Sequence, residues 1–371
     1  MAQHALDAMQ AAGEALNELG VDQSLPIDPF PLFGELGLKL VFQPLEGLLG
    51  AILDPTAELA QPGVLISTSR GPGSQRYTAA HELGHWFLHR DQLAGNPAAD
   101  GIAEIYGVGS TVPREREAQI FAAYFLMPLP LVGSVAGRYG VRRNSEVTPV
   151  QMYSIARDLH VSYEAATRQL ENLSFIDRGV RDDLLRVPPS RIKRELGRDR
   201  APTNTAADVW LVSQPGERSV SAFVGDDVVL CLAENPSTGH RWMSRGSYDE
   251  AVQATAETTA PPAFGNGVAL RFATAESIEA PRLGEAGELL RPVADRFVRS
   301  ETASDLVGNG GERVVTLVAE RRGVWKVELI YASPFDPAPP VAEMALEIEI
   351  LNGPQQWAKN SRIAAVIGEN G

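Results

Sequence analysis

Two histidines and a glutamate at fixed spacing are the residues of this chain best suited to chemistry. Residues 81–85 read His-Glu-Leu-Gly-His, inside the largely apolar stretch TAAHELGHWFLH. In a helix, positions i and i+4 lie one above the other on one face, so both imidazoles can bind one metal ion. Glu82 lies beside them, where its carboxylate can take a proton from a water held by the metal. The pattern predicts a hydrolytic zinc site with His81 and His85 as ligands and Glu82 as general base.

A catalytic zinc ion also needs a third protein ligand and one open position. Cys231, the one cysteine, lies far along the chain in an apolar run typical of a buried strand. His89 continues the helical spacing, but three ligands along one straight helix cannot converge on one ion, so we expect it outside the ligand set. The stretch REREAQIFAAYFLMP predicts a second helix that offers Glu115 and Glu117. These two point about 200° apart and cannot both face the histidines, and the apolar positions favour Glu115 only modestly.

The first half of the chain has the elements of an α+β domain. Residues 1–20 predict an amphipathic helix, and the stretches LGLKLVF and GVLIST predict short strands. Residues 77–90 and 114–126 predict the two helices that carry the candidate ligands. A third helical region is expected over about 148–173. Gly84 would allow the backbone of another element to approach closely.

The second half has the period of two that is typical of strands. The predicted strands lie between about residues 207 and 351 and read VWLVSQ, SVSAFVG, DVVLCLAE, ALRFATAE, ERVVTLVAE, GVWKVELIYA and MALEIEIL. Such a series predicts an all-β immunoglobulin-like sandwich over 206–352. Residues 177–205 carry eight Lys or Arg against five acids and predict a basic linker with a short helix around 190–197. Residues 353–371 are expected to form a C-terminal tail.

Composition excludes several classes of function. The formal net charge of −14 disfavours direct binding to nucleic acid or to anionic lipid. Apolar residues make up 44% and charged residues 22%, which is typical of a globular protein. No window is apolar over the roughly 18 residues that a membrane span needs, and the N-terminus lacks the pattern of a secretory signal. A single cysteine allows no intrachain disulfide, so we expect a cytoplasmic protein that does not enter the membrane.

The paired motifs RYTAAHELGHWFLH and EREAQIFAAYFLMP resemble the ImmA/IrrE family of bacterial and phage metallopeptidases. That family shows H-E-x-x-H after an apolar run and, about thirty residues later, E-x-x-A-N-x-F-A-A-x-L-L-M-P. The resemblance covers roughly residues 5–176. It implies a zincin-like metallopeptidase domain over 1–176 with one zinc ion, and its third ligand falls on Glu115. Gln119 stands where the family usually has Asn.

The second half resembles chagasin-like inhibitors of papain-type cysteine proteases. Three segments carry this resemblance in the family's order. They are Asn235-Pro236-Ser237-Thr238-Gly239-His240 with Trp242 for N-P-T-T-G-[YF]-x-W, Gly308-Asn309-Gly310-Gly311 for G-x-G-G, and Ser333-Pro334-Phe335 for R-P-W or R-P-F. In a sandwich, alternate strand connections gather at one end, so these loops would form one surface. Ser333 and His240 depart from the inhibitor pattern.

These observations support a zinc endopeptidase that makes limited cuts in a partner protein. The ImmA/IrrE resemblance suggests a transcriptional repressor as that partner, and the sandwich would then supply recognition or regulation. The alternative is a cysteine-protease inhibitor or binding protein, with a papain-like partner and a catalytically silent metal domain. An intact Glu82 favours the first hypothesis, because a silent scaffold needs no carboxylate there. A third hypothesis places the sandwich loops in the metal cleft of their own chain.

Overall fold

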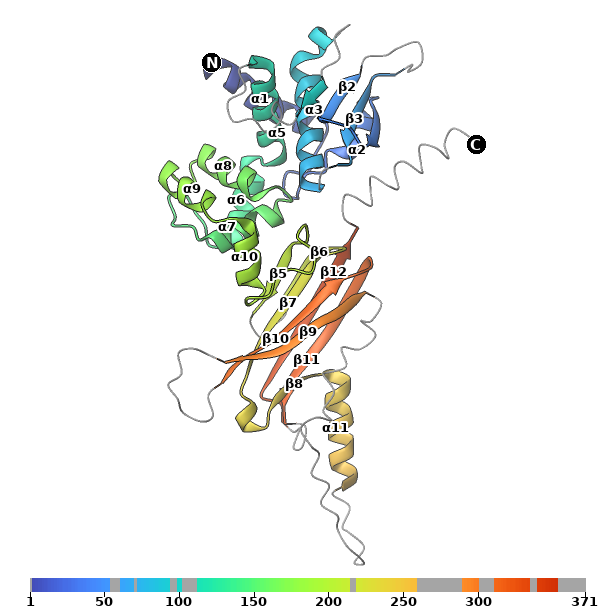
Figure 1. The fold of residues 1–371 in the computed structure, drawn as a ribbon, viewed down its shortest axis with the longest axis vertical. Coiled ribbons are helices and arrows are strands. Elements are labelled where there is room, and N and C mark those ends of the chain that lie inside the picture. The colour runs from blue at the N-terminus through green and yellow to red at the C-terminus, as the bar shows by residue number, and fades with distance from the viewer. Residues whose placement is uncertain are drawn as a thin grey trace, which may run out of the picture. The chain divides into compact units, whose positions relative to one another are not determined.

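The chain forms two compact units. The computed structural model describes residues 2–53, 61–69, 72–93, 99–101, 112–213, 218–258, 289–299, 310–333 and 339–352. The first unit runs to Ile192 and the second begins at Lys193 (Figure 1). This division falls inside the segment 177–205 that was predicted as a linker.

The first unit mixes helices with one small sheet. Its elements are α1 (Ala2–Glu18), α2 (Phe30–Glu35), β1 (Lys39–Gln43), β2 (Leu48–Leu53), β3 (Gly63–Ser67), α3 (Pro72–Leu93), β4 (Ala99–Gly101), α5 (Pro113–Leu126), α6 (Leu129–Arg138), α7 (Pro149–Asp158), α8 (Tyr163–Asn172), α9 (Arg178–Leu185) and α10 (Pro189–Leu196), which crosses into the second unit. The sheet order is β1-β3-β2-β4. β1 pairs parallel with β3, and β2 pairs antiparallel with β3 and β4. The predicted α+β composition of this half is confirmed.

Helix α3 packs on β2 and β3 and, along its length, on α5, while α5 also packs on α1. Gly84 makes the α3–α5 contact close. A Cβ atom at that position would lie 3.0 Å from Ala118 Cα and 3.1 Å from Ala118 O. The helices therefore meet through a glycine and an alanine, and the close backbone approach expected at Gly84 is confirmed. Phe121, one turn after Ala118, is fully buried beside this contact.

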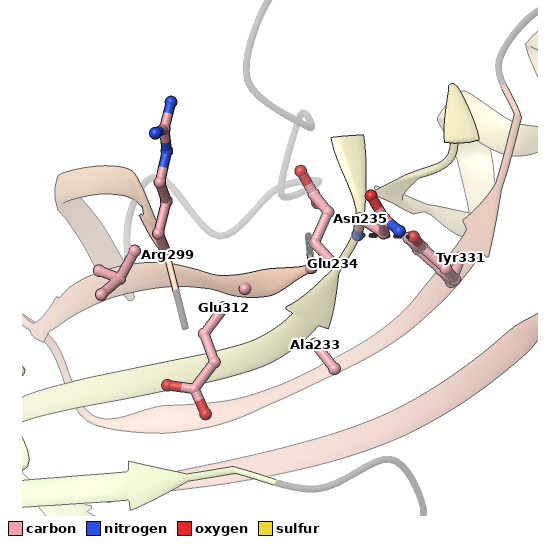
Figure 2. A pocket seen from close by; sticks show the side chains of 9 residues that line it. Ala233, Glu234, Asn235, Arg299, Glu312 and Tyr331 are labelled. Atoms are coloured by element: carbon pink, nitrogen blue, oxygen red, sulfur yellow. Dashed lines mark hydrogen bonds between the residues drawn. The ribbon is translucent and has the colours of Figure 1, made fainter. Parts of the chain in front are cut away.

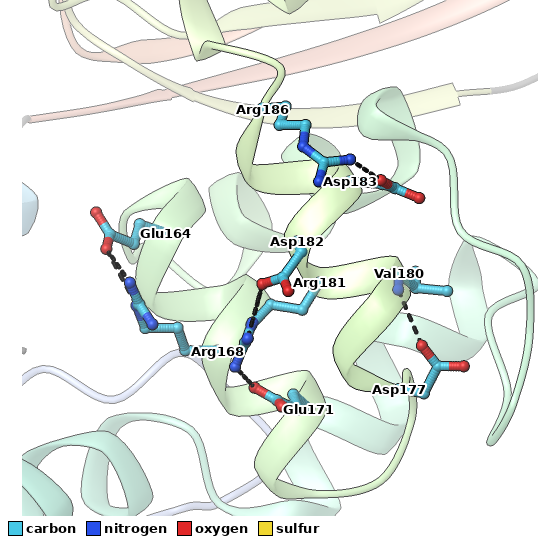
Figure 3. A network of polar contacts seen from close by, with 9 residues as sticks. All are labelled: Glu164, Arg168, Glu171, Asp177, Val180, Arg181, Asp182, Asp183 and Arg186. Carbon is cyan, nitrogen blue, oxygen red and sulfur yellow. Dashed lines mark hydrogen bonds and ion pairs between the residues drawn. The ribbon is translucent and has the colours of Figure 1, made fainter.

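The helical region predicted over about 148–173 is confirmed. It consists of two helices, α7 and α8, separated near His160, whose φ is 56°. Residues 177–205 contain α9 and α10. In α8 and α9, arginines pair with nearby acids (Figure 3): Arg168 with Glu164, Arg181 with Glu171 and Asp182, and Arg186 with Asp183. This pairing reduces the positive field that a nucleic-acid partner would need.

The second unit consists mainly of two four-stranded sheets. Its elements are β5 (Val209–Val212), β6 (Arg218–Phe223), β7 (Asp227–Glu234), the 3-10 helix η1 (Pro236–Thr238), β8 (Arg241–Ser244), α11 (Arg245–Thr258), β9 (Leu290–Arg299), β10 (Gly311–Ala319), β11 (Gly323–Ala332) and β12 (Ala342–Leu351). The sheet orders are β5-β7-β10-β9 and β6-β12-β11-β8. One hydrophobic core joins the sheets, with Trp210 and Leu230 from the first and Trp242, Trp325 and Ile348 from the second.

The predicted β domain is therefore confirmed as a two-sheet β structure. Six of the seven predicted strands fall on β5, β6, β7, β10, β11 and β12. The seventh, ALRFATAE, and the tail 353–371 lie outside the described residues. The sequence analysis missed β8, β9 and helix α11.

Among the described residues, no single helix has the length and apolar character to cross a membrane, although the bent pair α5 and α6 passes the same test when taken together.

Candidate metal centre

Three buried side chains from two helices converge in the first unit. His81 and His85 lie one turn apart on α3, and Glu115 lies in the first turn of α5. His81 Nε2 is 3.1 Å from His85 Nε2, and Glu115 Oε2 is 3.3 Å from both nitrogens. All three side chains are buried. The structure thus brings together the three residues that the sequence analysis proposed as zinc ligands.

The geometry of this triangle fits a tetrahedral zinc ion. Two ligand atoms bound about 2.0–2.1 Å from zinc at a tetrahedral angle are separated by about 3.3 Å. The three distances of 3.1–3.3 Å match one triangular face of such a site. Two imidazoles and one carboxylate leave the fourth position for water or substrate, as in catalytic rather than structural zinc sites. Among the described residues, His81, His85 and Glu115 form the cluster of side chains that could hold a metal ion.

The electrostatics of Glu115 suit a metal ligand. Burial raises the pKa of the Glu115 carboxyl, but its contacts with His81 and His85 outweigh burial and hold that pKa well below its usual value. Its other oxygen, Oε1, accepts a hydrogen bond from Arg114 Nε at 3.1 Å. Glu115 is therefore ionised at neutral pH, as a ligand must be.

Glu82 lies on α3 beside the triangle and is fully buried. Strand β2 passes directly over its carboxylate. A Cβ atom added at Gly50 would lie only 2.3 Å from Glu82 Oε1 and 2.6 Å from Thr78 Cγ2. Glycine at position 50 therefore makes the space that the Glu82 carboxylate occupies. The sequence analysis missed this residue, because the contact depends on how β2 is laid against α3 and no local pattern announces it.

His89 and Glu117 lie outside the triangle but next to it. His89 is buried on α3, with its Nδ1 3.2 Å from His85 Nδ1 and its Nε2 2.8 Å from Glu117 Oε2. Eight residues separate His89 from His81, which is about 12 Å along the helix axis, so the two cannot share one ion. This geometry agrees with the prediction that His89 is not a ligand of the same ion.

The second unit brings together described parts of two of the three predicted inhibitor loops. Asn235, Gly310 and Gly311 line a cavity of about 760 Å³ together with Tyr331, which lies two residues before Ser333. Figure 2 shows Asn235 beside Tyr331, whose hydroxyl oxygen accepts a hydrogen bond from Asn235 N at 2.9 Å. Gly308, Pro334 and Phe335 lie outside the described residues.

The rest of the first loop is held by its own hydrogen bonds. Asn235 Oδ1 accepts from Ser237 N and Oγ, and Thr238 Oγ1 donates to Asn235 O. Gly239 has a φ of 74°, a conformation that favours glycine. The ring of His240 lies 5.7 Å from that of Tyr331, and buried Trp242 donates from Nε1 to Ala233 O. Pro236 lies in the short helix η1. The loop is therefore ordered around a buried tryptophan.

The first unit is a mixed helix-and-sheet domain in which His81, His85 and Glu115 could hold a metal ion. Residues 33–171 match the family model described as the IrrE N-terminal-like domain, a family of the M78 peptidases. The chain thus contains an IrrE N-terminal-like domain. The match indicates a protein of the metallopeptidase type. A comparison with curated protein sequences finds no significant match.

Several solved structures are similar to part of the chain at low identity. The cysteine protease inhibitor EhICP2 from Entamoeba histolytica shares 15% identity with a TM-score of 0.26, over 39% of this chain and 97% of that one. PbICP-C in complex with falcipain-2 shares 12% with a TM-score of 0.25, over 39% and 100%. The ICP of Leishmania mexicana shares 20% with a TM-score of 0.21, over 39% and 90%. Scores of this size do not establish a common fold.

Proposed function

We propose that this chain is a cytoplasmic zinc-dependent endopeptidase that makes limited cuts in a partner protein. The observation that carries the proposal is the buried triangle of His81, His85 and Glu115, whose ligand atoms lie 3.1–3.3 Å apart. The match of the surrounding residues to an M78 peptidase family supports it. The proposed fold of this unit is zincin-like, with both histidines on one helix and the glutamate on the next.

The residues of the site divide the chemistry between them. When bound, zinc supplies a Lewis acid that polarises the substrate carbonyl and acidifies water. Glu82 holds the proton taken from the attacking water and can return it to the leaving amine. Its carboxylate is fully buried, away from bulk solvent. Because Gly50 has no side chain, the Glu82 carboxylate can occupy the space next to it.

Metal analysis of matched variants tests the ligand set. Glu115→Ala removes one vertex of the triangle, and two histidines alone hold zinc poorly, so the dialysed variant should lose its zinc. Glu117→Ala on the same helix should keep nearly full stoichiometry when dialysed without a competing chelator, because all three ligands remain and its carboxylate faces His89 instead. The reverse order of zinc loss would show that Glu117 is the ligand and that the proposed site is wrong.

The proposed substrate is a protein, and the ImmA/IrrE resemblance makes a transcriptional repressor the first candidate. Incubating the zinc-loaded chain with candidate repressors, and mapping the products by mass spectrometry, tests this. One or two discrete cuts that disappear with a chelator are expected. Complete degradation to small peptides would contradict limited proteolysis.

A second candidate function is inhibition of a papain-like cysteine protease through an immunoglobulin-like, chagasin-like second unit. The observation that favours it is the convergence of Asn235, Gly310 and Tyr331 on one cavity. Gly310 has room for a side chain, its nearest neighbour being 3.5 Å from an added Cβ. Gly310→Arg should therefore weaken inhibition of papain by the full chain. Val324→Arg is the matched control, since Val324 is 50% exposed and about 23 Å along β11 from Tyr331. No inhibition by the unmodified chain would remove this candidate.

A further inference from the structure

Two side chains connect the candidate ligand His85 to a second carboxylate. His85 Nδ1 lies 3.2 Å from His89 Nδ1, and His89 Nε2 lies 2.8 Å from Glu117 Oε2. His89 is 4% exposed, and the Glu117 side chain is 17% exposed. The other oxygen of Glu117, Oε1, lies 2.8 Å from Nδ1 of His4, a 66% exposed residue on α1. A continuous set of contacts therefore runs from the metal site to the surface.

These contacts determine which ring nitrogens carry protons. A carboxylate only accepts hydrogen bonds, so His89 Nε2 must be the donor to Glu117. A neutral imidazole carries a single N–H, and the contact with the Glu117 carboxylate places that proton of His89 on Nε2. With its proton on Nε2, the ring offers Nδ1 as an acceptor, and the donor facing it is His85 Nδ1. His85 is thereby left with its lone pair on Nε2, the atom that faces His81 and Glu115.

We propose that His89 and Glu117 are positioning residues that hold His85 in its Nδ1–H tautomer, ready to bind the metal through Nε2. The inference rests on the proposed metal site and adds to it the two residues that prepare one ligand. Histidine ligands in metal sites commonly donate their second ring nitrogen to a carboxylate or carbonyl. Here His89 lies between the ligand His85 and the carboxylate of Glu117. The carboxylate therefore acts on His85 through His89, although Glu117 lies on a different helix. The arrangement ties the orientation of a ligand on α3 to a residue on α5.

The test compares three variants by competition with a zinc chelator. Glu117→Leu removes the acceptor and should weaken zinc affinity about 10- to 100-fold. Glu117→Gln keeps an acceptor oxygen for His89 and should stay within about fivefold of the unmodified chain. His4→Ala removes only an exposed contact of Glu117 and should change affinity by less than about threefold. Glutamine keeps both the size of the side chain and an acceptor oxygen, so the tautomer of His85, rather than zinc affinity, separates a hydrogen-bond role from packing.

The ring-nitrogen spectrum of His85 in the metal-free, ¹⁵N-histidine-labelled protein gives a second readout. We expect the Nδ1–H tautomer in the unmodified chain and a mixture with the Nε2–H tautomer in Glu117→Leu. Equal zinc affinity in Glu117→Leu and the unmodified chain, or an Nε2–H tautomer in the latter, overturns this inference and leaves the metal site standing. If the unmodified chain binds no zinc, the proposed function itself fails. If Glu117→Leu does not fold, the spectrum of the unmodified chain still shows which tautomer His85 adopts and so tests the inference.

Discussion

Gly84→Ala tests whether the close contact of α3 with α5 sets the geometry of the metal site. The added Cβ would lie 3.0 Å from Ala118 Cα, 3.1 Å from Ala118 O and 3.2 Å from Phe121 Cβ. Optimal carbon–carbon contacts are about 3.5–4.0 Å, so the first of these is short by about 0.5 Å. Two of the three atoms belong to backbone, which cannot turn aside. The helices must therefore move apart.

The size of the effect follows from two opposing contributions. Overpacking a close contact costs about 1–3 kcal/mol, while alanine in place of a helical glycine returns about 1 kcal/mol. Gly84→Ala should thus destabilise the first unit by about 0–2 kcal/mol. Gly13→Ala in α1 is the matched control, because nothing lies within 4 Å of its added Cβ. It should stabilise by about 1 kcal/mol, so the two variants should differ by about 1–3 kcal/mol.

The same movement should weaken zinc binding. Glu115 Oε2 lies 3.3 Å from both Nε2 atoms, already near the tetrahedral separation of about 3.3 Å. Moving α5 away by about 0.5 Å should lower zinc affinity at least about 10-fold, which is about 1.4 kcal/mol. Urea unfolding and chelator competition measure the two quantities. If both glycine variants are stabilised alike and bind zinc alike, the contact does not set the distance between the helices.

Three further predictions concern catalysis and stability. Glu82→Gln should retain zinc and lose at least about 100-fold in turnover, because an amide cannot accept the proton of water; near-normal turnover on a cognate substrate would refute the assignment. Gly50→Ala should also retain zinc, yet lose about 100-fold in turnover, because a methyl 2.3 Å from Glu82 Oε1 displaces the carboxylate by about 1 Å; loss of zinc instead would point to a wider collapse. Burial, with help from Arg76 and Arg157, lowers the pKa of His160 to about 3. The unfolded chain therefore binds the extra proton between about pH 6.5 and pH 3, and stability falls as pH is lowered through that range. His160→Asn, which suits the φ of 56°, should show a smaller loss of urea midpoint between pH 7 and pH 5, and an unchanged loss would contradict the role of His160.

Within the predicted linker 177–205, the short helix expected around 190–197 is confirmed as α10 (Pro189–Leu196), whereas α9 (Arg178–Leu185) was not predicted. Arg181 contacts Glu171 from the preceding helix, ten residues earlier in the chain (Figure 3). The number of charged residues describes only the composition of the segment. Helix formation there depends on the residue that caps the helix and on ion pairs between side chains. Asp177, for example, accepts from Val180 N at the start of α9.

Local sequence patterns predict the candidate metal ligands on α3 and the division of the chain into an α+β part and a β part. A five-residue motif fixes two imidazoles on one helix face because the helical period is a local property. Alternation of apolar residues likewise predicts strands such as β7 and β11 without knowledge of their partners. Glu115 and Glu117 were left as alternatives by the residue pattern alone, and the choice between them came from a resemblance.

The contacts of each of those residues depend on how the helices and strands pack. Glu115 meets His81 and His85, while Glu117 meets His89, because the packing of α5 on α3 sets which side of each helix faces the other. Gly50 reaches Glu82 only because β2 pairs between β3 and β4 and lies against α3. Such contacts join residues about thirty positions apart, and their distances depend on helix separation and sheet register. Those quantities arise from the packing of the whole unit, which no short stretch of sequence encodes.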